Sequence, residues 1–156
     1  MSMEKFMQRA LALALEKMSD NNGGPFGAVI VRNGEIISEG WNRVTSSNDP
    51  SAHAEITAIR AACEKLGAFN LPDCDIYTSC EPCPMCLGAI YWARLRHIYY
   101  ANTRDEAAAI GFDDAFIYRE IGIDPVDRRI PATRLAPIGA DKPFALWAAK
   151  PDKVPY

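Results

Sequence analysis

An α/β fold is predicted by the way helical and strand-like patterns alternate along this chain. Apolar residues recur at helical spacing over 3–19, and a short apolar run follows at 26–32. Farther on, a β-rich run at 74–79 is separated by a helix-like stretch from a second β-rich run at 96–101. Strands that alternate with helices indicate a layered fold with crossover connections.

Turn and cap residues set the bounds of the expected elements. Asn33-Gly34 predicts a tight hairpin. Asp49 or Ser51 is expected to cap the helix that follows the polar, turn-like residues 42–52. Pro84 suits a first helical turn. In chain order we expect a helix at 3–19, strands at 26–32 and 35–41, a helix at 52–66, a strand at 74–79, a helix at 84–92, a strand at 96–101, helices near 103–110 and 112–119, a strand near 132–138 and a helix near 143–149.

The bulk composition indicates one globular domain over residues 1–156. The net charge of −3 argues against a nucleic-acid-binding surface. The longest apolar run near the N-terminus, Ala10 to Leu15, is six residues, so neither a membrane span nor a secretory signal is expected. Five cysteines without such a signal favour metal binding or catalysis over disulfides, and we expect a cytoplasmic protein.

Two short motifs predict a catalytic zinc site. His53-Ala54-Glu55 and Pro82-Cys83-Pro84-Met85-Cys86 each lie at the start of an expected helix. His53, Cys83 and Cys86 give three protein ligands for one zinc ion per chain, which leaves the fourth position to a water that the metal acidifies. Glu55 lies near this site without being needed as a ligand, so it is expected to move protons. The combination H-x-E with P-C-x-x-C is typical of zinc nucleobase deaminases.

Other interpretations of these cysteines remain open. Cys80, Cys83 and Cys86 have the spacing of part of an iron–sulfur run, but the position of the fourth cysteine is Ile90. Cys80 as a fourth zinc ligand would close the site and leave Glu55 without a role. A thiol nucleophile would need a histidine partner, and His97 in its apolar strand is better explained as structural.

Several stretches carry a family resemblance over nearly the whole chain. Residues 51–55 and 78–90 resemble the cytidine deaminase superfamily, in the branch of purine and cytosine deaminases that includes tRNA adenosine deaminase. Residues 23–31, 44–50, 91–94 and 111–118 are similar to the bacterial guanine deaminase family. The resemblance is weakest at about 121–142 and in the last few residues.

This resemblance implies a three-layer α/β/α fold around a central mixed five-stranded sheet. It also implies conversion of guanine to xanthine and ammonia, with the zinc-bound water as nucleophile and Glu55 as proton shuttle. Members of that family form homodimers in which a C-terminal segment, here about 120–156, is swapped between subunits.

The same resemblance implies four substrate contacts. Phe26 would stack on the purine, Asn42 would hydrogen-bond its edge, Asp114 would accept from its N–H groups, and Tyr156 would come from the other subunit. Each residue also has a structural interpretation: core packing for Phe26, a turn for Asn42, a helix cap for Asp114 and a disordered tail for Tyr156.

Two other functions remain open. The first is deamination of another base or nucleoside, namely guanosine, cytosine or tRNA adenosine, although the acidic chain disfavours an RNA substrate. The second is a non-catalytic structural zinc module, which lacks an obvious fourth ligand.

Overall fold

The structure, a computed structural model, describes residues 2–156 and divides into two compact units, Met1–Ala115 and Phe116–Tyr156. The first unit contains the sheet and the helices that pack on it. No helix in the described residues is long and apolar enough to span a membrane.

A mixed sheet with the strand order β2-β1-β3-β4 forms the centre of the first unit. The strands are β1 (Gly27–Arg32), β2 (Glu35–Trp41), β3 (Cys74–Cys80) and β4 (His97–Asn102). β1 runs antiparallel to β2 and β3, whereas β3 and β4 are parallel. The expected hairpin between β1 and β2 is present, and its Asn33 and Gly34 have φ angles of 52° and 80°.

The sheet has four strands in residues 2–156, so the prediction of five strands was wrong. The strand expected near 132–138 is absent, and this segment has no regular secondary structure. Pro131 and Pro137 flank or interrupt it and remove backbone N–H donors that a ladder would use. Leu135 and Ile138 are almost fully exposed, so no surface in the structure covers their side chains.

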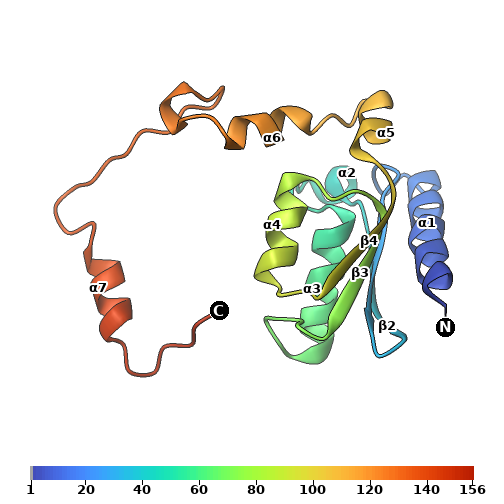
Figure 1. Cartoon of the computed structure of the whole chain (residues 1–156), viewed down its shortest axis with the longest axis horizontal. Helices are drawn as coiled ribbons and strands as arrows, with labels where there is room; N and C mark the ends of the chain where they lie inside the picture. The colour runs from blue at the N-terminus through green and yellow to red at the C-terminus, as the bar shows by residue number, and fades with distance from the viewer. Residues whose placement is uncertain (1) are drawn as a thin grey trace. The chain divides into compact units, whose positions relative to one another are not determined.

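Helices cover both faces of the sheet (Figure 1). α1 (Met3–Ser19) packs on one face, where Phe6 and Leu13 meet Val29 and Tyr77. α3 (Ala54–Leu66) and α4 (Pro84–Trp92) lie over the other, where small residues of α3 pack against apolar side chains of β1, β3 and α4. The predicted α/β fold class is therefore confirmed.

The start of α3 differs from the expectation. Its N-cap is His53, which makes no side-chain capping hydrogen bond. Asp49 does not cap it, because its Oδ1 accepts hydrogen bonds from the backbone N–H and the hydroxyl of Ser51. The expected cap was therefore wrong. A four-residue helix, α2 (Val44–Ser47), also forms within the stretch expected to be turn-like.

The remaining helices are short. α5 (Arg104–Ala109) begins with a complete capping box between Thr103 and Glu106. It is followed by α6 (Ala115–Ile121), the 3₁₀ helix η1 (Pro125–Asp127) and α7 (Lys142–Ala149). In the second unit, the Arg128 guanidinium donates to the carbonyls of Glu120 and Ile123 after the end of α6. None of the residues 116–156 of the second unit is buried.

Candidate metal centre and substrate pocket

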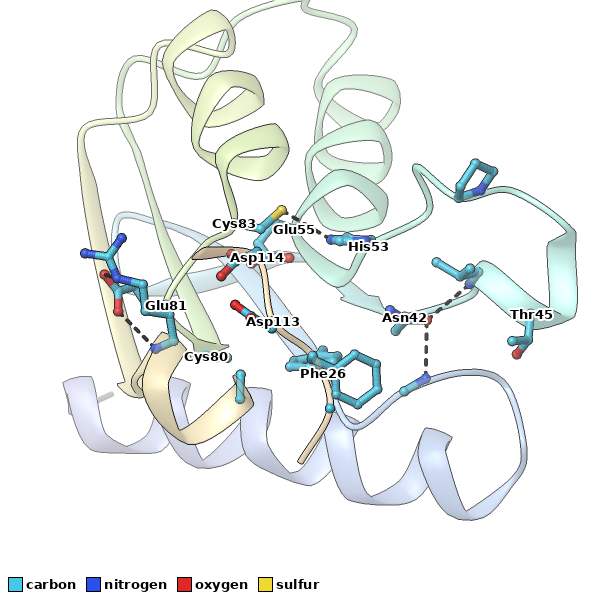
Figure 2. A pocket seen from close by; sticks show the side chains of 17 residues that line it. Phe26, Asn42, Thr45, His53, Glu55, Cys80, Glu81, Cys83, Asp113 and Asp114 are labelled. Atoms are coloured by element: carbon cyan, nitrogen blue, oxygen red, sulfur yellow. Dashed lines mark hydrogen bonds and ion pairs between the residues drawn. The ribbon is translucent and has the colours of Figure 1, made fainter. Parts of the chain in front are cut away.

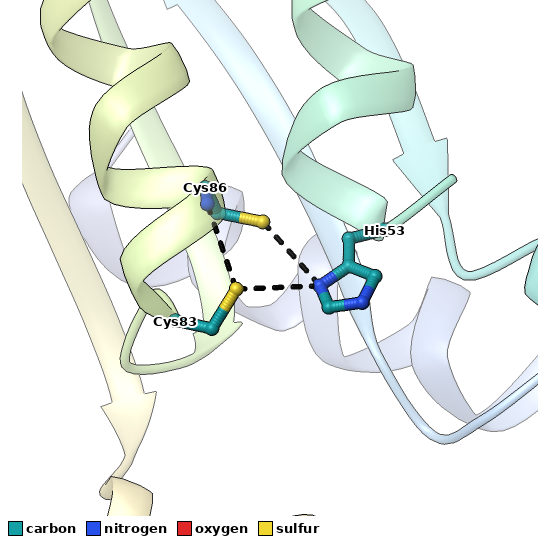
Figure 3. A group of neighbouring side chains, drawn as sticks. All are labelled: His53, Cys83 and Cys86. Atoms are coloured by element: carbon teal, nitrogen blue, oxygen red, sulfur yellow. Dashed lines mark hydrogen bonds between the residues drawn. The ribbon is translucent and has the colours of Figure 1, made fainter. Parts of the chain in front are cut away.

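The three predicted zinc ligands come together at the N-termini of two helices. His53 is the N-cap of α3 and Cys83 is the N-cap of α4, while Cys86 lies in the first turn of α4 (Figure 3). Pro84 starts α4 with the fixed backbone angle that suits a first helical position. Helix N-termini stabilise negative charge, so this placement favours thiolate ligands.

The distances between these donor atoms fit a zinc ion. His53 Nδ1 lies 3.5 Å from Cys83 Sγ and 3.5 Å from Cys86 Sγ. Around a tetrahedral ion with Zn–N of about 2.0 Å and Zn–S of about 2.3 Å, a nitrogen and a sulfur ligand lie roughly 3.5 Å apart. All three donor atoms lie within 4.8 Å of one another. One nitrogen and two sulfurs at these separations suit zinc and leave one tetrahedral position for a non-protein ligand.

The pKa values of the two cysteine thiols are shifted in opposite directions in this arrangement. Hydrogen bonds from Cys86 and from His53 lower the pKa of the Cys83 thiol to about 4. The pKa of Cys86 is raised, chiefly by hydrogen bonding with the neighbouring Cys83 sulfur and by burial. The Cys83 thiolate is therefore ready to bind a cation, and metal binding would release the proton of Cys86.

Glu55 lies beside this cluster with its side chain almost fully buried, at 6% exposed. Its Oε2 accepts a hydrogen bond from Cys86 Sγ at 3.4 Å, and its Oε1 accepts one from Thr78 Oγ1 at 3.3 Å. Burial raises the pKa of the Glu55 carboxyl. A carboxyl group with a raised pKa next to a metal site is suited to accept and return protons.

A cavity of about 440 Å³ opens in front of His53, Glu55 and Cys83 (Figure 2). Phe26, Asn42 and Asp114 all line it, so three of the four predicted substrate contacts share one cavity with two of the predicted metal ligands, His53 and Cys83. Desolvation raises the pKa of the Asp114 carboxyl. Tyr156 belongs to the other compact unit, and its contact with a substrate stays a prediction.

The orientation of the Asn42 side chain is fixed by backbone donors. Its Oδ1 accepts hydrogen bonds from the backbone N–H of Gly24 at 3.3 Å and of Val44 at 3.2 Å. The side chain belongs to a residue that is only 6% exposed and that borders the cavity. Since Oδ1 is already used, the amide nitrogen is the group that a ligand can use, and it is a donor.

A second aromatic ring lines the cavity and was not anticipated. Phe112 meets Phe26 edge to face, with ring centroids 4.9 Å apart and an interplanar angle of 89°. It follows Gly111, whose φ of 96° favours glycine. Only the resemblance of residues 111–118 drew attention to this stretch, because a single phenylalanine after a glycine has no pattern of its own.

The other cysteine of the motif has a different environment. Cys80 Sγ donates to the carbonyl of Thr103 at 3.7 Å, and Cys80 is not among the three clustered donors. Glu81 accepts a hydrogen bond from the backbone N–H of Arg104 at 3.0 Å, which joins the start of α5 to the end of β3. No local sequence pattern reveals this contact of Glu81, because its backbone partner lies 23 residues away.

Comparison with known proteins gives a consistent result. The family described as "Cytidine and deoxycytidylate deaminase zinc-binding region" matches residues 1–102. Guanine deaminase of Bacillus subtilis (strain 168) is 54% identical over 156 residues, which is 100% of both chains. The X-ray structure of guanine deaminase from Bacillus subtilis matches with a TM-score of 0.98 and 54% identity over 100% of this chain and 99% of that one. The tRNA-specific adenosine deaminase of Agrobacterium fabrum is 43% identical over 105 residues, 67% of this chain and 68% of that protein.

Proposed function

This chain belongs to the cytidine and deoxycytidylate deaminase zinc-binding family, and on that premise we propose that it hydrolyses guanine to xanthine and ammonia. His53, Cys83 and Cys86 would hold one zinc ion, and Glu55 would carry the protons. The observation that carries the proposal is the full-length similarity to a guanine deaminase, together with a cavity in which the zinc ligands and polar base-binding groups meet.

The extent of similarity favours guanine over a tRNA substrate. The match to the tRNA-specific relative stops at about two thirds of this chain, whereas the match to the guanine enzyme includes all of it. Asp114 lies beyond the residues that the family description covers. The net charge of −3 also disfavours the phosphate contacts that a tRNA would require.

The donors and acceptors of the cavity complement a guanine ring. The Asn42 amide nitrogen is a donor, which suits the O6 and N7 acceptors of guanine. The Asp114 carboxylate is an acceptor, which suits ring N–H groups. Phe26 offers an aromatic ring to the base, and the ring of Phe112 stands perpendicular to it. In the proposed binding mode, these contacts would turn the amino-bearing carbon of guanine towards the metal ligands.

A zinc ion bound by these residues would supply the Lewis acidity that lowers the pKa of the attacking water. Glu55 Oε2, on the side of Cys86, accepts the proton of that water. Glu55 gives this proton to a ring nitrogen, then takes the second proton of the former water from the added hydroxyl and gives it to the amino group, which leaves as ammonia.

The proposal includes a homodimer in which the segment from about 120 to 156 is swapped and Tyr156 closes the partner's cavity. Support comes from large apolar side chains in this segment that are exposed in the single chain: Ile130, Leu135, Ile138, Phe144 and Leu146. Such side chains are rarely left uncovered by soluble monomers. The five free cysteines fit a reducing compartment, so a cytoplasmic location is part of the proposal.

Ammonia release from zinc-loaded protein tests the function. Guanine, guanosine, adenine, cytosine and a tRNA are offered in parallel, with a chelator-treated sample as the control. Turnover confined to guanine, lost on chelation and restored by zinc, is the expected result. Turnover of another substrate alone would contradict the guanine assignment, and stoichiometric zinc without any turnover would favour a structural zinc module.

A further inference from the structure

Glu55 is held by a buried hydroxyl that belongs to neither the metal ligands nor the cavity wall. Thr78, on β3, is 1% exposed, and its Oγ1 donates to Glu55 Oε1 at 3.3 Å. Thr78 does not line the cavity, so it has no access to the base. We infer that Thr78 is a positioning residue that anchors Oε1 of Glu55 and leaves Oε2 to transfer protons. This inference rests on the proposed function.

Thr78 lies at a buried position of the sheet, where a polar hydroxyl needs a hydrogen-bond partner. In the register Thr78 is opposite Ala28 of β1 and beside Tyr100 of β4. It shares a strand face with Ile76, which packs in the core beneath α3. A valine would fill the same volume without a polar atom, and a buried hydroxyl is costly unless it is hydrogen-bonded. The bond to Glu55 satisfies this hydroxyl.

The second side-chain donor to Glu55, Cys86, would lose its proton on binding a metal. Cys86 Sγ donates to Oε2 at 3.4 Å, but only while it is a thiol. A zinc ligand is a thiolate, which has no proton to donate. Thr78 then remains as the side-chain donor to Glu55. Thr78 thus holds one carboxylate oxygen, while the other lies on the side of the metal ligands.

A pair of substitutions separates the hydroxyl from the volume of the side chain. Thr78→Val keeps the shape and removes the donor, whereas Thr78→Ser keeps the donor. For Thr78→Val we expect kcat on guanine to fall by about ten- to a hundred-fold, because a misoriented catalytic group is costly. The KM for guanine should change less than about two-fold, since Thr78 does not touch the base. Thr78→Ser should recover kcat to within a few-fold of the wild type.

The matched control is Ser38→Ala. Ser38 is also buried on the sheet, and its hydroxyl donates to the carbonyl of Ala58 in α3 at 2.7 Å, but it does not contact Glu55. Its loss should lower the melting temperature and leave kcat close to that of the wild type. Zinc content and xanthine affinity by calorimetry should be unchanged in Thr78→Val. These two measurements do not depend on turnover.

A double-mutant cycle provides the decisive comparison. In a Glu55→Gln background, Thr78→Val should reduce the residual kcat by less than about two-fold, because the group that it positions is already disabled. A kcat for Thr78→Val equal to the wild type, a Ser variant as slow as the Val variant, or an equal loss in the Glu55→Gln background would each overturn the inference. Failure of the proposed function is distinct, because the wild type itself would then not release ammonia from guanine.

Discussion

Replacing Gly40 with alanine tests whether β2 sets the position of the helix that carries the site. Gly40 is buried and faces α3, and a Cβ built there would lie 2.3 Å from the carbonyl oxygen of Ala54 and 2.4 Å from the amide nitrogen of Ala58. These are backbone atoms of a helix, so they cannot rotate away as a side chain would. His53 and Glu55 belong to the same end of α3, and they would move with it.

The size of the effect follows from these distances. Restoring an ordinary contact of 3.4 Å requires α3 to retreat by about 1 Å. Overpacking of this kind costs about 1–3 kcal/mol. In a chain of this length it should lower the melting temperature by roughly 5 °C. A displacement of about 1 Å at a catalytic group can cost on the order of a hundred-fold in rate, so activity should fall more than stability alone would suggest.

Two glycine variants serve as controls in the same assays of thermal unfolding, zinc content and ammonia release. Gly88→Ala, in α4, meets no atom within 4 Å and should be neutral or slightly stabilising. Gly27→Ala would put its Cβ 2.3 Å from the carbonyl of Ala10 in α1, which carries no zinc ligand, so it should lose stability but keep zinc. A Gly40→Ala enzyme with wild-type melting temperature and kcat would refute the reasoning.

Three further outcomes are expected. Glu55→Gln should keep stoichiometric zinc and lose about 10²- to 10⁴-fold in guanine turnover, and an active variant would remove its role as proton carrier. Cys83→Ala should lose both zinc and activity, and elemental analysis that found full zinc content would rule out this ligand. Glu39, whose pKa is lowered chiefly by the hydrogen bond from Arg9, should stabilise the fold above its ordinary pKa of 4.5 and cease to do so as the pH falls through the lowered value. Glu39→Gln should therefore cost about 0.5–1 kcal/mol at pH 7, the size of a solvent-screened pair, and nothing in strong acid; a loss that is independent of pH in denaturant titrations would contradict this.

The regular elements were predictable because their patterns are local. The apolar stripe of α1, the Asn33-Gly34 hairpin and the proline start of α4 appear within a few residues of the sequence. The segment at 132–138 has a strand-like composition as well, but a strand needs a neighbour, and neighbours are set by tertiary structure. The predicted cap of α3 was wrong for a related reason, because the Asp49 carboxylate accepts its hydrogen bonds from Ser51 instead of from the helix.

The cluster of candidate metal ligands was predictable from two motifs, whereas the groups around it were not. His53 and Cys83 are recognisable from their residue types and from their positions at the starts of helices. Thr78 has no such signature, because its hydrogen bond to Glu55 joins residues 23 positions apart. Phe112 likewise depends on how α5 returns the chain to Phe26. Contacts of this kind become visible only when the sheet brings distant segments together.

The position of the ligands at two helix starts also has a consequence for how the chain is held together. His53 and Cys83 are 30 residues apart in sequence, so an ion bound to both closes a ring of chain that includes β3. Ring closure of this size restricts the unfolded chain much as a disulfide does, an effect of about 3–4 kcal/mol in chain-entropy terms. An ion that takes part in catalysis would thus also cross-link α3 to α4. Removal of the ion should speed amide hydrogen exchange in α4 more than in the sheet, and an exchange experiment with and without a chelator would measure this difference.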